Sequence, residues 1–322
     1  MSIEMQPLEV QFNSVAPVQV APLQISNPVQ PIKLKDLIII GAIVVIWGIA
    51  FVGMKEILHS SSPFKAAGLR FVIAGLCLLP FALRPSRLRQ LHPVDYVKFA
   101  TLGFFQTSLL FGIIFVSLQY VPAGLSSIIL NTNPFFVAIF AHFIIKGDQL
   151  TRQKIIGLVV GFSGVLVLVL AGGKSLGDVA LYWPLILLVA SVVWASSTIL
   201  IKLFRFQDML TVTAWQTFLG SLPLLAIGFL FETKPIDFNW NFGLWLLYIA
   251  VPGSAFAWWA WNGMVQRYSA SRVSVFLFLI PVCGVLSGVL LLGESLSYSL
   301  LIGGALVASG IILVNLRLKR KV

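Results

Sequence analysis

The residues with the clearest chemical use in this chain are tryptophans that lie deep inside apolar segments. Trp47 and Trp194 each precede a lysine, Lys55 or Lys202, by eight residues. If these lysines mark the ends of helices, each indole lies about 12 Å deeper along the helix axis. Tryptophan usually sits at the membrane interface instead, and a buried indole N–H needs an acceptor. Cavity lining explains this depth, and helix packing is the alternative.

Arg70 is a basic residue within an apolar segment. An arginine at the centre of an isolated membrane helix costs about 2.5–3.5 kcal/mol on insertion scales. Because it follows Pro63 by seven residues, its side chain has a route to snorkel toward the outer surface, where Glu56 is a candidate partner. The functional alternative is a cation that attracts a carboxylate or phosphate on a substrate. The sequence leaves both interpretations open.

Two prolines, Pro134 and Pro281, fall near the centres of apolar segments and are 147 residues apart. Each removes a backbone hydrogen bond and frees the carbonyl four residues earlier, at Leu130 and Leu277. Such a carbonyl is tolerated within a membrane only against protein, water or a ligand. We therefore predict that both prolines are gating kinks beside a central substrate cavity, with purely structural kinks as the alternative.

Polar side chains at similar depth complete the predicted substrate cavity, because amides and hydroxyls in apolar segments need partners. The residues expected to line it are Trp47, Arg70, Gln106, Asn131, Trp194, Ser254, Trp258 and Asn262.

The elements that position these residues are apolar runs long enough to cross a membrane. The chain has 322 residues, of which 58% are hydrophobic and 10% charged, and its mean hydropathy is +0.97. A soluble domain carries about 25% charged residues, and about 20 apolar residues span the hydrocarbon layer. We predict ten membrane helices, at 37–57, 64–83, 96–117, 122–145, 154–171, 179–201, 211–231, 242–266, 273–292 and 299–316.

The two halves of the chain repeat each other. The run WGIAFVGMK at 47–55 returns 147 residues later as WASSTILIK at 194–202. Five spans per half form an odd number, so the second half enters the membrane from the opposite side. Such inverted repeats are typical of alternating-access transporters. We divide the chain into a flexible cytoplasmic tail at 1–36, a first repeat at 37–171, a second repeat at 179–316 and a basic tail at 317–322.

The net charge of +11 follows from the loops between the spans. With a cytoplasmic start, seventeen of the 22 Lys and Arg residues lie on the cytoplasmic side. This excess is the usual bias of cytoplasmic loops, so no nucleic-acid partner is needed to explain it. We expect both termini in the cytoplasm of a multi-pass plasma-membrane protein, in a bacterial inner membrane.

The side chains that catalysis or metal binding would need are scattered. His59, His92 and His142 are far apart in the sequence, and Cys77 and Cys283 belong to no CxxC motif. No Walker A sequence is present. We therefore predict no enzyme activity, no metal and no cofactor. The middle third of every span lacks Asp and Glu, which favours facilitated diffusion or exchange over proton coupling.

Small residues predict where helices approach closely, because membrane helices pack through them. Gly157, Gly161 and Gly164 mark the fifth span, and Gly304 with Ala308 the tenth. We expect these seams to pack within a monomer, with dimerisation through the fifth and tenth spans as an alternative. Apart from membrane lipids, the expected partner is a small-molecule substrate.

Several longer motifs resemble the EamA-type members of the drug/metabolite transporter superfamily. They are IWGIAFVGMK, the LRF run at 69–71, NPFFVAIFAHFIIKGDQLTRQKIIGLVVGFSG at 133–164 and RVSVFLFLIPVCGVLSGVLLLGESLSYSLLIGGALVASGIILVN at 272–315. Asp148 stands where the family usually carries Glu, the residue present at Glu294. The resemblance implies a ten-helix carrier with a central cavity and, typically, export of amino acids or other metabolites.

We therefore expect a secondary carrier that moves small organic metabolites by alternating access, with amino acids or related compounds as the first guess and export or exchange as the direction. A passive channel or a lipid scramblase is the alternative. An integral-membrane enzyme that modifies lipids is a further one, disfavoured because such chemistry needs clustered Asp, His or Cys.

Overall fold

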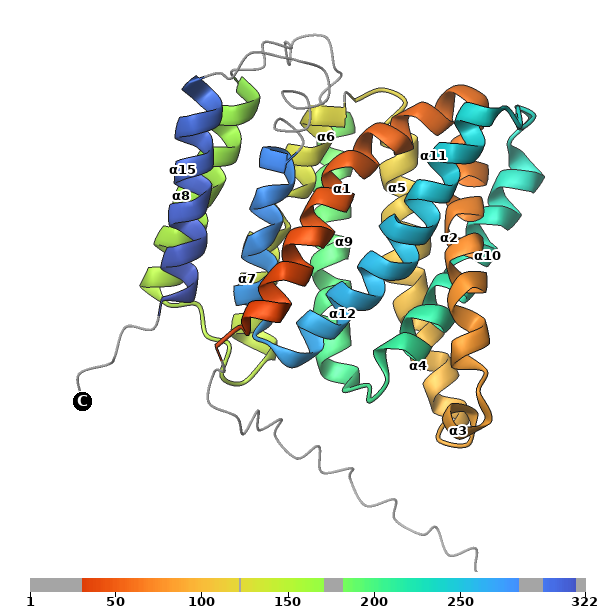
Figure 1. Cartoon of the computed structure of the whole chain (residues 1–322), viewed down its shortest axis with the longest axis horizontal. Coiled ribbons are helices and arrows are strands. Elements are labelled where there is room, and N and C mark those ends of the chain that lie inside the picture. Colours follow the sequence, from red (N-terminus) through yellow and green to blue (C-terminus); the bar gives the residue numbers. More distant parts are fainter. Residues whose placement is uncertain (1–30, 122, 171–181, 284–297, 317–322) are drawn as a thin grey trace, which may run out of the picture.

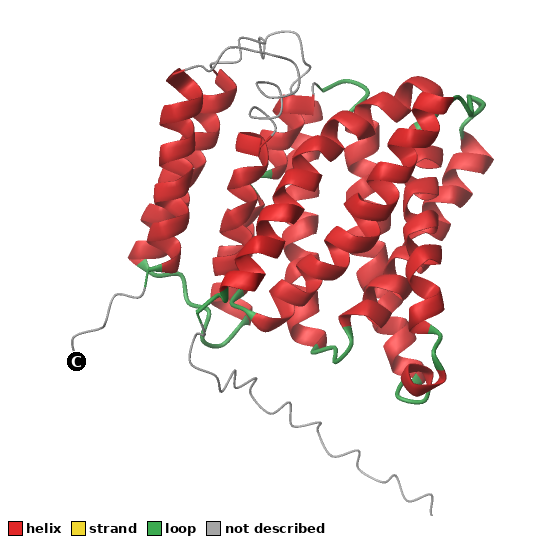
Figure 2. Cartoon of the chain, viewed as in Figure 1, coloured by secondary structure: helices red, strands yellow, loops and turns green. Residues whose placement is uncertain are grey.

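The computed structural model describes residues 31–121, 123–170, 182–283 and 298–316, which form one bundle of helices (Figure 1). Backbone groups have no water partners in hydrocarbon, so apolar segments satisfy them internally as helices. Within the described ranges all regular structure is helical (Figure 2). The predicted tails at 1–30 and 317–322, the connection at 171–181 and Glu294 lie outside the described residues.

The first repeat supplies five spans, two of them composite. They are α1 (Leu34–Ser60), α2 (Pro63–Ala82), α4 (Pro93–Gly103) continued by η1 (Phe104–Leu109) and α5 (Leu110–Ser117), α6 (Ala123–Leu130) with α7 (Asn133–Ile144), and α8 (Arg152–Leu170). A short helix, α3 (Pro85–Leu88), lies in the loop after α2. The first helix begins at Leu34, so the N-terminal tail ends earlier than the expected residue 36.

The second repeat follows the same order. Its described elements are α9 (Tyr182–Phe204), α10 (Met209–Phe231), α11 (Trp240–Ala250) continued by η3 (Val251–Phe256) and α12 (Ala257–Arg267), α13 (Ala270–Ser274) with η4 (Val275–Phe278), and α15 (Tyr298–Asn315). Side chains fix two of the starts: Asp208 accepts from the Leu210 N–H and Asn239 from the Phe242 N–H. Such caps satisfy the free N–H groups of a first turn.

Seven helices in the described ranges are long and apolar enough to cross a membrane. The other three expected spans correspond to α8 and to two shorter apolar helices, Ala270–Cys283 and Leu301–Asn315. The all-α membrane fold predicted from the sequence is confirmed. The boundary between the eighth and ninth spans moves, because α12 ends at Arg267 and the next helix already begins at Ala270.

Equivalent helices of the two repeats pack against each other. The most extensive pairings are α2 with α10, the second and seventh spans, and α8 with α15, the fifth and tenth. Figure 1 shows α8 and α15 side by side at one edge of the bundle. Both pairings join a helix to its own repeat counterpart, which is the arrangement that a pseudo-twofold axis produces.

The α8–α15 pairing is a close backbone contact through glycine. A Cβ at Gly161 would stand 2.7 Å from the Phe278 ring, and one at Gly310 would stand 2.5 Å from Gly161. Gly164 similarly faces the Gly303 carbonyl at 2.6 Å. The expected seam on α15 was wrong in its register, because a Cβ at Gly304 would meet only Val282 at 4.0 Å, whereas Gly303 and Gly310 make the contact with α8. These glycine faces are covered within one chain, and the oligomeric state stays a prediction.

A second close crossing joins α4 to α10. A Cβ at Gly103 would lie 2.5 Å from the Gln216 carbonyl oxygen, and one at Gly220 would lie 2.5 Å from the Gly103 carbonyl. The Ser108 hydroxyl also donates to the Gly220 carbonyl at 2.7 Å. This crossing holds the third and seventh spans at backbone contact.

Both described chain ends lie at the same end of the bundle, here called the terminal face. Asp36, near the start of α1, bonds Tyr268, and Asn315, at the end of α15, bonds Arg272. Figure 1 shows the start of α1 and the end of α15 on this side.

Substitution of Gly220 by alanine should destabilise the protein, because the added methyl meets the Gly103 backbone and cannot be relieved by a side-chain rotation. Overpacking of this kind costs about 1–3 kcal/mol. Gly41→Ala is the matched control, since nothing lies within 4 Å of its Cβ position, and alanine is the better helix former. Thermal melting of the two detergent-purified variants should show a lower Tm for Gly220→Ala only; equal melting would contradict the crossing.

Candidate functional site

Four indoles from both repeats meet at the centre of the bundle. This tryptophan cluster consists of Trp47 on α1, Trp194 on α9, and Trp258 and Trp261 on α12, all of them buried. Ring centroids of Trp47 and Trp194 lie 5.8 Å apart at 80°, an edge-to-face contact, and Trp47 lies 4.9 Å from Trp258. Edge-to-face and tilted aromatic pairs of this kind stabilise one another beyond their buried area. The repeated tryptophans therefore contact each other across the repeat interface.

A small cavity of about 40 Å³ adjoins this cluster. Its wall includes Trp47, Trp194 and Trp258, together with Arg70 and Phe111. Leu130 and Ile280, at the two helix breaks, also line it. A cavity of this size holds about one water molecule. A metabolite would fit only after the helices separate, so the structure corresponds to a conformation with a contracted central cavity.

The eighth span widens into a π-helical turn, η3, where it passes the cavity. Pro252 has no N–H, so the ordinary helical bond to the carbonyl four residues earlier is missing. In the rearranged turn the Gly253 carbonyl accepts the Trp47 indole N–H at 3.0 Å and an Arg70 N–H at 3.5 Å. The Ser254 hydroxyl donates to the Ile249 carbonyl at 2.8 Å. One irregular turn thereby joins α1, α2 and the eighth span.

The third span carries a corresponding π-helical turn. η1 begins at Phe104 and η3 at Val251, which are 147 residues apart, as are the repeated tryptophans. Such turns occur frequently at functional sites. The pseudo-symmetry thus extends to an uncommon backbone conformation: η3 binds Trp47 through the Gly253 carbonyl, and η1 binds Asn262 through Gln106.

The hydrogen bonds of the repeated tryptophans differ. Trp47 donates to the Gly253 carbonyl, but the buried Nε1 atoms of Trp194, Trp258 and Trp261 have no acceptor among the described residues. A buried N–H without a partner is costly. Two of these three indoles, Trp194 and Trp258, line the cavity, so a molecule bound there lies beside two side chains whose donors have no acceptor among the described residues.

Arg70 is buried beside the cavity and does not snorkel. Its side chain is 1% exposed. Nε donates to the Ser254 hydroxyl at 2.6 Å, and one terminal nitrogen lies 2.9 Å from the Met54 sulfur. The guanidinium also lies 4.6 Å from the Phe111 ring centroid, a cation–π geometry. The suggested pairing with Glu56 was wrong, because the hydrogen-bond partners of Arg70 among the described residues are neutral.

Gln106 and Asn262 form a separate amide cluster instead of lining the cavity. Their side chains bond each other at 3.3 Å in both directions. Gln216 donates to the Gln106 oxygen, and Asn262 donates to the Thr213 hydroxyl at 3.3 Å. All four side chains are buried. The cluster ties the third, seventh and eighth spans together, and Ser254, also expected in the lining, supports Arg70.

Helix breaks precede both predicted gating prolines. The fourth span breaks between Leu130 and Asn133, just before Pro134, and the ninth passes through η4 just before Pro281. The freed Leu130 carbonyl accepts from the Ser191 hydroxyl at 3.3 Å. Asn131 lies in the first break and donates to the Ser127 carbonyl at 2.6 Å. It is buried next to the cavity wall without lining it.

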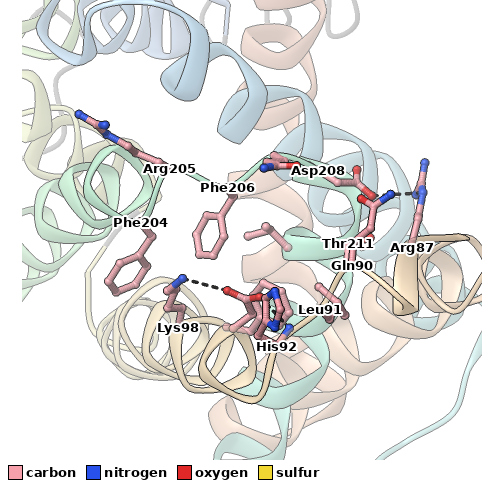
Figure 3. A pocket seen from close by; sticks show the side chains of 14 residues that line it. Arg87, Gln90, Leu91, His92, Lys98, Phe204, Arg205, Phe206, Asp208 and Thr211 are labelled. Carbon is pink, nitrogen blue, oxygen red and sulfur yellow. Dashed lines mark hydrogen bonds and ion pairs between the residues drawn. The ribbon is translucent and has the colours of Figure 1, made fainter. Parts of the chain in front are cut away.

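A second pocket, about 280 Å³, opens at the terminal face between segments 87–99 and 204–212 (Figure 3). It is polar, and two ion pairs line it: Arg87 with Asp208 at 3.2 Å and Lys98 with Asp95 at 2.9 Å. The first pair links the two repeats. Because these charges neutralise each other near solvent, the pocket offers less specific recognition than the buried cavity, although it is larger.

At the terminal face, two buried carboxylates of the first repeat bind residues of the second repeat. Asp36 accepts from the Tyr268 hydroxyl and pairs with Arg267 at 3.3 Å. Asp148 accepts from the Ser271 N–H at 3.1 Å. Burial would raise the pKa of the Asp148 carboxyl, but the Lys154 ammonium and the hydrogen bonds from Lys154 and Ser271 outweigh it and hold this pKa below its usual range. We call these contacts the terminal latch.

Sequence reasoning missed several residues of the site. Gln216 had a usable signal, because an amide inside an apolar span needs partners. Phe111 and Met54 had none, since apolar residues in a membrane helix face lipid, neighbours and cavities alike. Trp261 belongs to an aromatic-rich run, yet its register toward Trp47 depends on the π-helical turn, which the sequence pattern does not reveal.

Comparison with known proteins agrees with this geometry. The model of the EamA-like transporter family matches twice, at residues 34–170 and 181–316. The chain belongs to the EamA-like transporter family. It is therefore a membrane transporter, and it is not an enzyme.

Curated relatives of this EamA-like protein cover nearly its whole length. The uncharacterized transporter YvbV of Bacillus subtilis (strain 168) is 32% identical over 89% of this chain and 93% of its own. A probable amino-acid metabolite efflux pump of Salmonella typhimurium is 28% identical over 86% of this chain and 93% of its own. A solved crystal structure covers 87% of this chain and 96% of that one, with a TM-score of 0.72 at 20% identity; this likeness shows a shared fold.

The two repeated tryptophans of this EamA-like protein predict a difference in stability. Trp47→Phe removes a buried donor and leaves the Gly253 carbonyl with only a 3.5 Å contact, which should cost about 1–3 kcal/mol. Trp194→Phe is the matched control, because its N–H has no acceptor to lose. Thermal melting should therefore show the larger decrease in Tm for Trp47→Phe, and equal decreases would mean that ring volume alone matters.

Proposed function

We propose that this transporter is a secondary carrier that exports or exchanges small organic metabolites, amino acids or related compounds, across the plasma membrane by alternating access. The observation that carries the proposal is the small cavity between the repeats, lined by Trp47, Trp194 and Trp258. Ligand sites combine apolar walls with a few convergent polar groups, and transporters with inverted repeats bind substrate at the repeat interface near mid-membrane.

The terminal latch and the helix breaks support alternation. With the latch closed, the cavity holds about one water molecule, so substrate entry requires the repeats to move apart. The breaks before Pro134 and Pro281 lie at the cavity wall through Leu130 and Ile280. Because these breaks interrupt the fourth and ninth spans beside the cavity, a change in helix direction at either break alters the cavity volume. In this proposal the latch opens when the cavity faces the terminal side.

The proposed orientation places the terminal face in the cytoplasm. This face carries the loops at 84–92, 145–151 and 205–208, which together contain five Lys and Arg residues, three of them in 84–92. Cytoplasmic loops of membrane proteins show an excess of these residues. Both termini would then be cytoplasmic, and the latch would be the cytoplasmic closure. Two relatives bear the name probable amino-acid metabolite efflux pump, in Salmonella typhimurium and Escherichia coli, which supports amino-acid-like compounds as the first substrates to test.

The alternatives fit the described structure less well. A passive channel needs a continuous polar path, whereas the central cavity holds about one water molecule and has a mostly apolar wall. A lipid scramblase needs a polar groove for headgroups, because charged groups in hydrocarbon are costly. The lateral groove of about 460 Å³ near Phe104, Trp183 and Ile227 is instead almost entirely apolar.

Substitution of Trp194 by alanine should lower the transport rate at least about tenfold, since it removes one wall of the cavity and one free donor, without lowering membrane abundance. The measurement is counterflow in proteoliposomes that are loaded with a mixture of amino acids and exposed to labelled members of the same set. Trp259→Ala is the matched control, because Trp259 is 39% exposed and lies outside the cavity wall.

Saturable entry that internal substrate stimulates would establish the carrier. Entry that is neither saturable nor stimulated would favour the channel. Equal rates for Trp194→Ala and Trp259→Ala would remove the tryptophan cluster from the substrate path.

A further inference from the structure

The charged and polar side chains around the central cavity indicate a narrower class of substrate than a transport function alone does. Arg70 is 1% exposed and lines the cavity. The ion pairs in the described part of the chain involve other residues, and the polar contacts of Arg70 are with a hydroxyl, a thioether and a carbonyl. A buried cation without an anionic partner is strongly disfavoured in a low-dielectric interior.

The neutral contacts of Arg70 leave part of its hydrogen-bonding capacity unused. A guanidinium has five N–H donors, and three acceptors face it. The Met54 sulfur is a weak acceptor, and the Gly253 carbonyl at 3.5 Å is already bound by Trp47. The rings of Phe71 and Phe111, with centroids 5.0 and 4.6 Å from the guanidinium carbon, stabilise the charge and hold the plane in position.

The other polar atoms on the cavity wall are also donors. Trp194 and Trp258 have unpartnered Nε1 atoms, and both side chains line the cavity. The remaining wall is apolar, with Phe51, Ile114 and Ile280 among its residues. The site therefore offers one fixed positive charge and two neutral donors to an acceptor, and an apolar surface to the rest of the molecule.

The number of cationic side chains at the cavity favours some anionic groups over others. The repeat offset of 147 places Thr217 at the position that corresponds to Arg70, and the Thr217 hydroxyl is bonded within its own helix to the Thr213 carbonyl at 2.6 Å. The cavity thus carries one cation where exact symmetry would supply two. A monoanionic carboxylate balances one arginine and matches its planar donors, whereas a phosphate dianion would leave charge uncompensated.

We propose that Arg70 binds the single carboxylate of an organic substrate with an apolar body, and that the indole N–H groups of Trp194 and Trp258 complete the binding site for that carboxylate. This inference rests on the proposed function and narrows it to compounds such as apolar amino acids and related carboxylic acids. The ammonium group of an amino acid would lie against indole faces, which attract cations.

The test compares probes that share a phenylethyl body and differ in charge: 3-phenylpropionate, its isosteric neutral amide 3-phenylpropionamide, and the cation phenethylamine. The full-length protein is assayed in two ways, by the increase in Tm that each probe causes in detergent and by competition against counterflow of labelled L-phenylalanine in proteoliposomes. For the wild type we expect the acid to be at least about tenfold more effective than the amide or the amine, the ratio that a charged hydrogen bond provides.

Variants assign this preference to the arginine. Arg70→Met should reduce the acid-to-amide ratio to near one, and Arg70→Lys should retain part of it, because lysine keeps the charge but loses the planar fork. Arg89→Met is the matched control: it removes the same charge from an exposed position on the terminal face and should leave the ratio unchanged. If Arg70→Met does not fold, the acid-to-amide ratios of the wild type and of Arg70→Lys still test the carboxylate site.

The two readouts separate this inference from the proposed function. An amide or amine as effective as the acid, with counterflow intact, overturns the carboxylate site and leaves the carrier standing. Acid-selective stabilisation without any counterflow supports the carboxylate site and contradicts the carrier. An unchanged ratio in Arg70→Met also overturns the inference, since the selectivity would then come from other residues.

Discussion

The Gly253 carbonyl accepts hydrogen bonds from the indole N–H of Trp47 and from an N–H of Arg70. The arrangement of the central cavity depends on these two bonds. Hydrocarbon supplies no water to an irregular turn, so the groups that Pro252 leaves without helical partners must be satisfied by neighbouring helices. The same turn presents Ser254 to the guanidinium. A defect in one helix thereby fixes the positions of a tryptophan on α1 and an arginine on α2.

Three polar clusters in this bundle have different physical roles. The amide cluster around Gln106 is bonded mainly among its own members and holds three spans together. The terminal latch uses two buried carboxylates: Asp36 pairs with Arg267, and Asp148 pairs with Lys154 and accepts from the Ser271 N–H. The cavity wall instead carries Arg70 without an anionic partner and two indoles, Trp194 and Trp258, whose N–H groups have no acceptor among the described residues. An imbalance of hydrogen-bonding groups, rather than polarity itself, therefore distinguishes the candidate site from the structural polar clusters.

The sequence predicted the helical membrane fold, the repeat and the meeting of Trp47, Trp194, Trp258 and Arg70, because hydropathy, the offset of 147 and buried polar types are local signals. The prediction that Gln106 and Asn262 line the cavity was wrong. An amide in a membrane helix indicates only that a partner exists, and whether that partner is a ligand or Gln216 depends on helix rotation. The π-helical turns set that rotation, and they leave no periodic pattern from which to predict it.

The two halves have kept the same backbone and diverged in the side chains at its centre. Thr217 occupies the position of Arg70 in the other half, on the helix that packs against α2. Two identical first halves assembled as a dimer would therefore bring a second guanidinium to the helix beside α2, and like charges repel strongly in hydrocarbon. They would also lack Ser254 and the Gly253 carbonyl. Covalent fusion of two unequal halves is what allows a single charge to stand near a twofold axis.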